Sequence, residues 1–199
     1  MTAEIGHVRI GVFGGTFDPP HLAHLMVADE LYSSLALDEV VFVPAGDPWQ
    51  KTTLASAEQR FDMVRLATDE DSRFRVSRVD IDREGPTYMV ETLSELQAEH
   101  PHAELFCIIG SDVLAGIHSW HDAESLPGLA TFVCAVRPGF TPNQPALNGL
   151  TVDFVEVPLM EISSSDVRQR ISEGESIRYL VPDAVADYIA THKLYGRTS

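Results

Sequence analysis

The hydrophobic positions of this chain fall into short runs that are apolar along most of their length, and segments with helical spacing separate them. Strands that are buried on both faces have this pattern, because neither face presents polar side chains to water. Such runs predict core strands at residues 8–13, 39–44, 105–109, 130–136 and 152–157. Residues 74–81 instead alternate between apolar and polar positions, which predicts a half-exposed strand.

Helices are predicted between these strands. Ser56 and Gln59 have the spacing of a capping box, and apolar residues at helical positions follow them. Thr87 is expected to cap a further helix, and Pro182 stands at the start of the last one. Other helices are expected to begin near residues 21, 113 and 162, with loops at residues 45–55 and 137–150.

Strands that alternate with helices predict an α/β fold. We expect a Rossmann-like, doubly wound parallel sheet of about six strands with helices on both faces. A single domain is predicted over residues 1–199, with a helical C-terminal part from about residue 160 packed on the sheet. Ligands of such sheets bind at the carboxyl ends of strands, so a site is expected in the loops after the first, second, fourth and sixth strands.

The stretch from Gly14 to His24 has the composition of a phosphate-binding turn. Gly14 and Gly15 follow the first strand, and without a Cβ their backbone can turn sharply and lie close to a ligand. Pro20 suits the first position of a helix, whose unpaired N–H groups and dipole favour an anion. His21 and His24 are three residues apart, so on a helix they share one face and can point at the same phosphate oxygens.

Other roles for these residues stay open at this point. The glycines fit an ordinary strand-to-helix turn, and the histidines fit surface positions or a metal site, although no further Cys or His stands nearby with ligand spacing. Asp18 is expected to cap the histidine helix. The G-x-G-x-x-G fingerprint and the Walker A pattern are absent from the sequence, which argues against a dehydrogenase and a P-loop enzyme.

Composition narrows the function further. The 199 residues carry a formal net charge of −16, which argues against a nucleic-acid surface. An anionic substrate would therefore need a local cluster of cations and N–H groups. Cys107 and Cys134 lie in apolar runs and are expected to be buried free thiols. No segment has the pattern of a signal peptide or a membrane span, so we expect a cytoplasmic protein that binds no membrane.

The chain resembles the nucleotidyltransferase superfamily with the H-x-G-H motif in the stretch Gly14-Gly15-Thr16-Phe17-Asp18-Pro19-x-His21-x-x-His24. Within that superfamily it is similar to bacterial nicotinate-nucleotide adenylyltransferases, with Ala23 where that family usually has Gly. A second motif of the family is similar to the segment Ser163-Ser164-Ser165-x-Val167-Arg168. Hydroxyl and N–H groups at a helix start, with an arginine beside them, can bind phosphate oxygens.

The resemblance implies roles for individual residues, and we expect the two motifs to share one cleft. The catalytic residues that it implies are His21, His24, Lys51 and Arg168. The residues implied to bind ATP are Gly14, Gly15, Thr16, Phe17, Ser163, Ser164 and Ser165. The residues implied to bind the mononucleotide are Thr87 and Tyr88 (through backbone N–H groups), Asp112, and Trp120, which would stack on the nicotinate ring. Without the resemblance, these residues fit helix caps, solvated cations and core aromatics.

The reaction that the resemblance implies moves AMP from ATP to nicotinate mononucleotide, giving deamido-NAD and pyrophosphate in NAD biosynthesis. Mg²⁺ is expected to enter with ATP, bound mostly by water and phosphate rather than by a protein cage. ATP and nicotinate mononucleotide are then the partners, and a homo-oligomer is left open. The alternatives are adenylyltransferases for nicotinamide mononucleotide or phosphopantetheine, and a nucleotide sensor without turnover.

Overall fold

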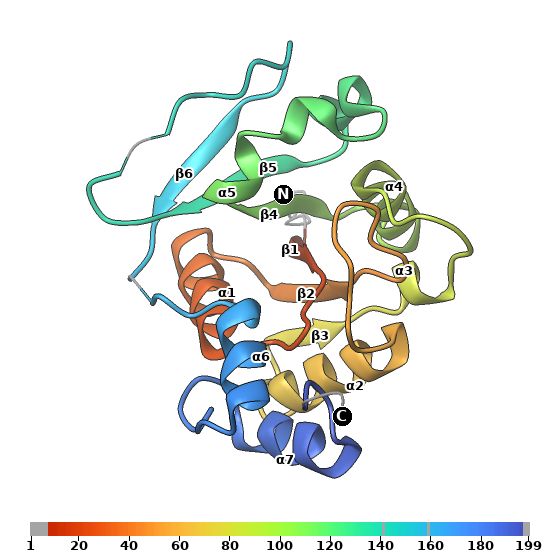
Figure 1. Cartoon of the computed structure of the whole chain (residues 1–199). Helices are drawn as coiled ribbons and strands as arrows, with labels where there is room; N and C mark the ends of the chain where they lie inside the picture. The colour runs from red at the N-terminus through yellow and green to blue at the C-terminus, as the bar shows by residue number, and fades with distance from the viewer. Residues whose placement is uncertain (1–7, 141, 159, 197–199) are drawn as a thin grey trace.

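The computed structural model describes residues 8–140, 142–158 and 160–196, and these residues form one six-stranded sheet in which every pairing is parallel (Figure 1). The strand order is β3-β2-β1-β4-β5-β6. The strands are β1 (Arg9–Gly15), β2 (Glu39–Pro44), β3 (Phe74–Val76), β4 (Glu104–Gly110), β5 (Thr131–Val136) and β6 (Val152–Glu156). The predicted doubly wound α/β fold is confirmed.

Helices cover both faces of this sheet. They are α1 (Leu22–Ser34), α2 (Ala57–Thr68), α3 (Val79–Asp82), α4 (Met89–Glu99), α5 (Ser111–Leu114), α6 (Ser164–Glu173) and α7 (Asp183–His192), with 3-10 helices η1 (Ile117–Ser119) and η2 (Ala123–Gly128). Leu93 of α4 and Leu126 of η2 are buried in the core on one side of the sheet. Leu31 of α1 and Val64 of α2 are buried in the core on the other side.

The C-terminal helices pack against α2. Val167 of α6 and Val185 of α7 form an apolar cluster with Met63 of α2. Val64, the next residue of α2, belongs to the cluster that covers the sheet. Helix α2 therefore lies between the sheet and α7, as Figure 1 also shows. The predicted domain limits at residues 1 and 199 lie outside the described residues.

The winding of the sheet reverses between β1 and β4. From β1 the chain moves outward through β2 and β3, and it then crosses to the other side of β1 for β4, β5 and β6. The register aligns Phe13 with Phe42 on one side and with Ile108 on the other, so the segments that follow β1, β2 and β4 emerge at the same edge. In sheets of this kind, ligands bind in the crevice outside this edge.

The predicted strand over residues 74–81 is too long. It ends with β3, and the short helix α3 takes up most of the remainder. The Ser77 hydroxyl accepts the N–H of Val79, which turns the chain away from the sheet. Asp80 is then buried and accepts a hydrogen bond from the hydroxyl of Thr92. The alternation therefore marks a strand only over residues 74–76, and Asp80 is buried by its contact with Thr92 in a helix.

The start of α2 follows the sequence prediction, and the start of α1 does not. Ser56 and Gln59 form the predicted capping box. Pro20 does not occupy the first helical position, because α1 begins at Leu22 with His21 as its N-cap. His21 therefore precedes the helix instead of lying within it.

Two further helix predictions are corrected by the structure. Thr87 does not cap α4: Tyr88 is the N-cap, and the Thr87 hydroxyl accepts the N–H of Asp47 from the loop after β2. The helix predicted over residues 113–117 is replaced by α5, which starts at Ser111, and by the separate 3-10 helix η1. The first difference arises from the contact of Thr87 with Asp47, which is distant in the sequence. The second is a change in helix type, because the segment continues as the 3-10 helix η1.

We expect the substitution Gly46→Ala to destabilise the fold. A Cβ at Gly46 would collide with the carbonyl oxygen of Asp80, so two backbone segments would have to move apart. The expected loss in the free energy of unfolding is roughly 1–3 kcal/mol, measured by urea denaturation. Gly128→Ala is the matched control, since a Cβ there meets nothing within 4 Å. Equal stability of the two variants would contradict the described packing.

Candidate active site

Two cavities meet at the carboxyl edge of β1 and β4. One has a volume of about 760 Å³ and the other a volume of about 180 Å³. The residues that line both are Phe13, Gly14, Gly15, Thr16, Lys51, Ile109, Gly110 and Val113. The cavities therefore share a wall formed by the ends of these strands. Lys51, on the exposed loop after β2, lies where the two cavities meet. The sequence analysis predicts that this residue binds phosphate.

The larger cavity brings the two sequence motifs together. Its lining includes Phe17, Asp18, His21, Ala23 and His24 from the first motif and Ser163, Ser164, Ser165 and Arg168 from the second. The Ser164 hydroxyl donates a hydrogen bond to the carbonyl oxygen of Pro19 at 2.8 Å. The Arg168 guanidinium donates to the carbonyl oxygen of Asp18 at 2.7 Å, across 150 positions of sequence. The prediction that the two motifs share one cleft is confirmed.

The two glycines at the end of β1 are closely packed. A Cβ at Gly14 would approach the methyl group of Met89 to 2.6 Å, and one at Gly15 would approach the ring of Phe17 to 3.0 Å. Phe17 itself has a φ of 50°, the left-handed region, and this turns the chain back over Gly15. The turn thus places the Phe17 ring beside the histidine pair.

Arg60 of α2 is a site residue that sequence reasoning missed. Its side chain is 1% exposed, and its guanidinium donates to the carbonyl oxygens of Thr16 at 2.9 Å and Gly46 at 3.0 Å. These bonds hold the loop after β1 against the loop after β2. Arg60 lies in the first turns of an amphipathic helix, where an arginine is usually solvated, so the sequence carries no signal for this role.

Asp18 does not cap α1, contrary to the prediction. Its buried carboxylate accepts the N–H groups of Leu54 at 2.8 Å and Ala55 at 3.2 Å, and the hydroxyl of Tyr195 at 2.7 Å. Burial and this carboxylate raise the pKa of the Tyr195 phenol. Asp18 therefore joins the histidine loop to the end of the Lys51 loop and to the segment after α7. Tyr195 was not predicted, since 177 positions separate it from Asp18.

The hydroxyl groups of the serine motif are already engaged in the protein. Ser163 is the N-cap of α6, and its hydroxyl accepts the N–H of Asp166. The Ser164 hydroxyl is bound to Pro19, and that of Ser165 accepts from Arg168 at 3.1 Å. Among the described residues, no hydrogen bond uses the backbone N–H of Ser164 or Ser165. Those N–H groups, rather than the hydroxyls, are the free donors at the start of α6.

The two histidines stack on one another. Their ring centroids are 3.6 Å apart with an interplanar angle of 26°. The backbone N–H of His21 donates to Nδ1 of His24 at 3.1 Å, so Nδ1 is unprotonated and the neutral ring carries its proton on Nε2. The Phe17 ring packs edge-on against His24 at 5.0 Å. These contacts leave the Nε2–H group of His24 as a fixed hydrogen-bond donor.

Both histidines are neutral at pH 7, so they supply hydrogen-bond donors and no net charge. Burial lowers the pKa of His21 to about 4, although Asp166 acts in the opposite direction. Burial also lowers the pKa of His24 well below its ordinary value, and His21 and Lys51 lower it further. The permanently charged cations that line the larger cavity are therefore Lys51, Arg137 and Arg168.

The start of α1 offers fewer free donors than the sequence suggests. The N–H of Leu22 donates to the carbonyl oxygen of Leu180 at 2.9 Å, and the N–H of His24 donates to that of His21 at 2.9 Å. These two groups of the first turn are unavailable to a phosphate unless their bonds break. Ala23, between them, lines the larger cavity with its methyl group in place of the family glycine.

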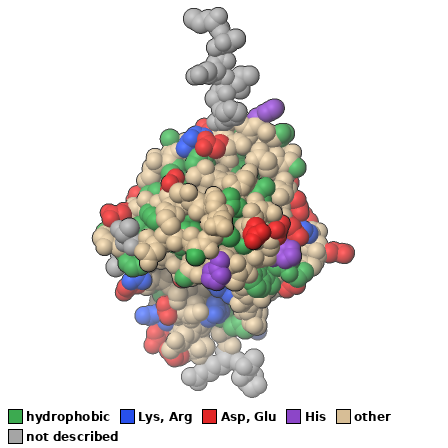
Figure 2. Space-filling view, turned by 90° about the horizontal axis from the view of Figure 1, so that it is seen from above, with side chains coloured by type: hydrophobic (Ala, Val, Ile, Leu, Met, Phe, Trp, Pro, Cys, Tyr) green, Lys and Arg blue, Asp and Glu red, His purple; other side chains and the backbone are tan. Residues whose placement is uncertain are grey.

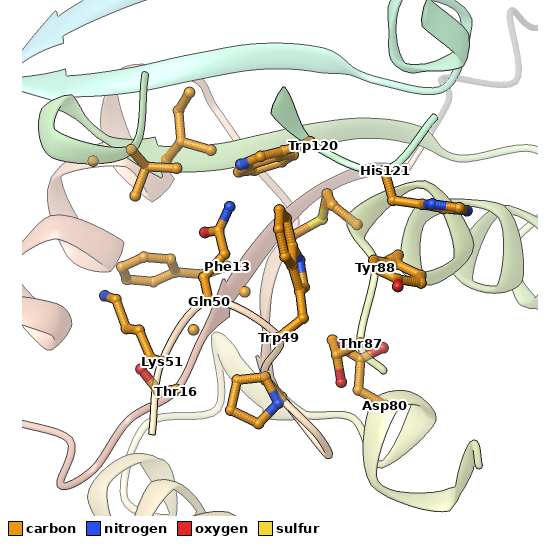
Figure 3. A pocket seen from close by; sticks show the side chains of 18 of the residues that line it. Phe13, Thr16, Trp49, Gln50, Lys51, Asp80, Thr87, Tyr88, Trp120 and His121 are labelled. Atoms are coloured by element: carbon orange, nitrogen blue, oxygen red, sulfur yellow. The ribbon is translucent and has the colours of Figure 1, made fainter. Parts of the chain in front are cut away.

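The smaller cavity is lined by aromatic side chains. Tyr88 lies between Trp49, at 6.1 Å between ring centroids, and His121, which stacks on it at 4.1 Å with an interplanar angle of 21°. Trp120 completes this lining from the segment after η1 (Figure 3). Trp120 thus lies in an aromatic cavity, and its stacking on a pyridine ring stays a prediction. His121 was not singled out from the sequence, although its position beside Trp120 was a usable signal.

Two residues expected to bind the mononucleotide are placed differently. The N–H of Thr87 donates to the carbonyl oxygen of Asp47 at 2.8 Å, so it is not free for a ligand. Among the described residues, no hydrogen bond uses the backbone N–H of Met89 or Val90 in the first turn of α4, and Met89 lines the smaller cavity. Asp112 lines the larger cavity and not the one that holds Trp120.

No protein metal centre or membrane-spanning helix is found within the described ranges. Those residues contain no group of three or more His, Cys, Asp or Glu side chains placed to hold a metal ion. None of their helices has the length and apolarity needed to cross a membrane.

Acidic side chains are spread over the face shown in Figure 2 rather than gathered into one patch. Cys107 and Cys134 are buried free thiols, as predicted.

A parallel sheet whose winding reverses beside a ligand-sized crevice is the arrangement by which open α/β proteins bind nucleotides. With its two sequence motifs hydrogen-bonded to each other at that crevice, this chain has the architecture of a nucleotide-binding α/β protein. A family model described as cytidylyltransferase-like matches residues 12–170. The chain belongs to this family and, within it, to the nicotinate-nucleotide adenylyltransferases, as its relatives establish.

These relatives match nearly the full chain. A protein of Leifsonia xyli subsp. xyli is 52% identical over 192 residues, covering 96% of each chain. One of Corynebacterium kroppenstedtii is 48% identical over 199 residues, covering 98% of this chain and 94% of its own. Both carry the name probable nicotinate-nucleotide adenylyltransferase.

Solved structures support the fold. The nicotinic acid mononucleotide adenylyltransferase of Plasmodium falciparum, complexed with NaAD, superposes with a TM-score of 0.79 at 23% identity. The superposition covers 95% of this chain and 98% of that chain. A structure of the same enzyme complexed with APC gives a TM-score of 0.76 over the same shares of the two chains.

The buried His21 ring predicts a stability loss in mild acid. In the unfolded chain the imidazole takes up a proton near pH 6.5, whereas in the folded chain it does so only near pH 4. The unfolded state therefore binds more protons in that window, and the free energy of unfolding falls as the pH drops, by up to ~3 kcal/mol from this group.

The measurement is urea denaturation at pH 7 and at pH 4.5, for the wild type and for His21→Gln. The variant is expected to lose less stability between the two pH values than the wild type does. The same loss in both proteins would mean that His21 is not held in a neutral state by the fold.

Proposed function

We propose that this chain transfers AMP from ATP to nicotinate mononucleotide and releases pyrophosphate, with the roles of its residues as follows. The observation that supports this proposal most directly is that the two cavities share a wall. The phosphate motifs, tied together by Arg168 and Ser164, line one cavity, and the aromatic cavity opens from the same strand ends. Two nucleotides bound in these cavities would bring their phosphates together beside Lys51.

In the proposed reaction, a phosphate oxygen of the mononucleotide attacks the α-phosphorus of ATP in line. The new P–O bond joins the two nucleotides, and the bond between the α-phosphorus and the bridging oxygen breaks, so that pyrophosphate leaves with the electron pair. The attacking oxygen is already an anion, so no general base is required. The protein contributes positioning and charge stabilisation, as in other phosphoryl transfers.

The Nε2–H of His24 is the proposed donor to the phosphate oxygens on which charge develops. Its orientation is fixed before substrate arrives, because Nδ1 accepts the His21 N–H. Lys51 and Arg168, with the N–H groups of Ser164 and Ser165, are proposed to hold the remaining phosphates. Mg²⁺ is proposed to enter with ATP and to neutralise phosphate charge, since its preference for water and phosphate ligands needs no protein cage.

On the other side of the wall, the pyridine ring is proposed to stack on Trp120. The N–H groups of the first turn of α4 are proposed to bind the carboxylate of the same substrate, in place of the Thr87 N–H, which is bonded to Asp47. A cytoplasmic location is also proposed, because buried free thiols such as Cys107 are typical of a reducing compartment.

The direct test is to mix the protein with Mg-ATP and, in separate reactions, nicotinate mononucleotide, nicotinamide mononucleotide or phosphopantetheine, and to follow pyrophosphate release. We expect turnover with nicotinate mononucleotide. Turnover with phosphopantetheine instead would reassign the substrate, and ATP binding without turnover on any acceptor would indicate a sensor.

The substitution His24→Ala is expected to reduce kcat by two or more decades, since it removes ~3 kcal/mol or more of transition-state stabilisation. The measurement is steady-state pyrophosphate release, with circular dichroism to verify the fold. His118→Ala is the control: this histidine is exposed on η1 and lines neither of the two cavities. Near-normal turnover of a folded His24→Ala protein would remove His24 from the mechanism.

Trp120→Ala is expected to weaken the binding of the mononucleotide and to leave ATP binding nearly unchanged. Loss of stacking on an aromatic ring costs ~1–3 kcal/mol by analogy with base stacking, which is roughly a 5- to 150-fold rise in KM for the mononucleotide. The KM values for the two substrates, measured separately, are the test. Equal changes for both substrates would contradict the stacking role.

A further inference from the structure

We propose that the Tyr195 hydroxyl positions the Lys51 segment, defined as residues 48–53, for binding the phosphates of ATP. Tyr195 lines neither of the two cavities and acts through the Asp18 carboxylate, so it is a positioning residue and not a catalytic one. This inference rests on the proposed function, because it concerns how the same site holds its phosphate-binding lysine.

The Lys51 segment forms part of the wall of both cavities. Residues 48–51 line the smaller cavity (Figure 3), and residues 51–53 line the larger one. Burial, His21 and Lys51 all lower the pKa of His24, so the charge of Lys51 acts at the histidine that is proposed to donate to phosphate. The position of the lysine therefore bears directly on the reaction.

Hydrogen bonds hold this segment at its two ends. Before it, the N–H and the carbonyl oxygen of Asp47 are both bonded to Thr87. After it, the N–H groups of Leu54 and Ala55 donate to the Asp18 carboxylate at 2.8 and 3.2 Å. In the part of the chain that the structure describes, no hydrogen bond involves a residue of the segment itself. The Asp18 carboxylate is therefore the polar anchor at the end that follows Lys51.

The Tyr195 hydroxyl supplies the third donor to that carboxylate. It donates to Oδ1 of Asp18 at 2.7 Å, and the same oxygen accepts the longer bond from Ala55. Burial and the Asp18 carboxylate raise the pKa of the phenol, so it keeps its proton at pH 7. Asp18 is 3% exposed, and loss of a donor to a buried carboxylate is unfavourable. Without the hydroxyl, we expect the carboxylate to reorient and its bonds to Leu54 and Ala55 to weaken.

The backbone after α7 adopts an uncommon conformation where it reaches Asp18. Lys193, the C-cap of α7, and Tyr195 have φ values of 53° and 62°. A left-handed residue is common at the end of a helix, whereas a tyrosine with positive φ beyond that end is an outlier. Such conformations persist where surrounding contacts fix them, and the bond to Asp18 is such a contact.

The histidine loop has supports that do not involve Tyr195. Arg168 donates to the carbonyl oxygen of Asp18, and Ser164 donates to that of Pro19. The N–H of Leu22 is also bonded, to the carbonyl oxygen of Leu180. Loss of the Tyr195 hydroxyl is therefore expected to act on the Lys51 segment and to leave the histidine pair in place.

Two tyrosines make a matched pair of variants. Tyr195→Phe removes the hydroxyl and keeps the ring, and Tyr188→Phe is the control. The Tyr188 hydroxyl also donates to a carboxylate, that of Asp62 of α2 at 3.1 Å, and neither of these two residues lines a cavity of the site. Each variant is also combined with Lys51→Ala in a double-mutant cycle.

Three measurements are made on each protein. Pyrophosphate release gives kcat/KM for Mg-ATP, and urea denaturation verifies that the variant is folded. Hydrogen exchange in the nucleotide-free protein reports the opening of the Leu54 and Ala55 amides, which a tyrosine that only stabilises the C-terminal helices would not change selectively.

Tyr195→Phe is expected to lower kcat/KM for Mg-ATP about tenfold and to speed exchange of the Leu54 and Ala55 amides about tenfold. In the Lys51→Ala background, the same change is expected to lower kcat/KM by less than about twofold, since the group that Tyr195 positions is already absent. Tyr188→Phe is expected to match the wild type in both measurements.

Three results would each overturn the proposal. The first is a Tyr195→Phe protein whose kcat/KM stays within about twofold of the wild type or whose Leu54 and Ala55 amides exchange at the wild-type rate. The second is a loss that adds fully to that of Lys51→Ala. The third is an equal loss in Tyr188→Phe, which would assign the effect to general destabilisation.

The outcomes also separate this inference from the function on which it rests. A wild-type protein that releases no pyrophosphate with any acceptor contradicts the proposed function. In that case the exchange of Leu54 and Ala55, with the Kd for a Mg²⁺-bound non-hydrolysable ATP analogue, still decides the role of Tyr195. Normal turnover of both wild type and Tyr195→Phe contradicts the inference and leaves the function standing.

Discussion

The loop between β1 and α1 is held by side chains from distant parts of the chain, and the site depends on this constraint. Arg60, Arg168 and Ser164 donate to the carbonyl oxygens of Thr16, Asp18 and Pro19. Those carbonyls would otherwise repel a phosphate, and their engagement removes that repulsion from the cavity. The same bonds fix the histidine pair relative to α6, so the donors are positioned before a nucleotide enters.

Electrostatics explains why the histidines are neutral. Two stacked imidazolium rings would repel each other, and burial disfavours even one charge, so the pair acts through N–H groups. Positive charge comes instead from Lys51 on an exposed loop and from Arg168 on α6. In a chain of net charge −16, this division keeps the positive charge where the phosphates are proposed to lie.

Local patterns were sufficient to predict the core strands, and the resemblance to a known family identified both motifs, because each of these features lies in a short stretch of sequence. Residues whose roles arise from long-range contacts were missed: Arg60 acts on a carbonyl 44 positions away, and Tyr195 on a carboxylate 177 positions away. Asp18 was assigned as a cap because capping is its local option, whereas tertiary contacts give it three other donors. The strand predicted over residues 74–81 is too long for a similar reason, since a contact between Asp80 and Thr92, 12 positions away, buries Asp80 in the short helix α3.

The central claim is that one pre-formed cradle holds the phosphates of ATP between the histidine loop and α6. A crystal structure with Mg²⁺, a non-hydrolysable ATP analogue and nicotinate mononucleotide tests it most directly. The account predicts that Nε2 of His24 lies within hydrogen-bond distance of an oxygen on the α- or β-phosphate, with Arg168 on the same triphosphate and its bond to Asp18 retained. A triphosphate bound away from both residues would contradict the account.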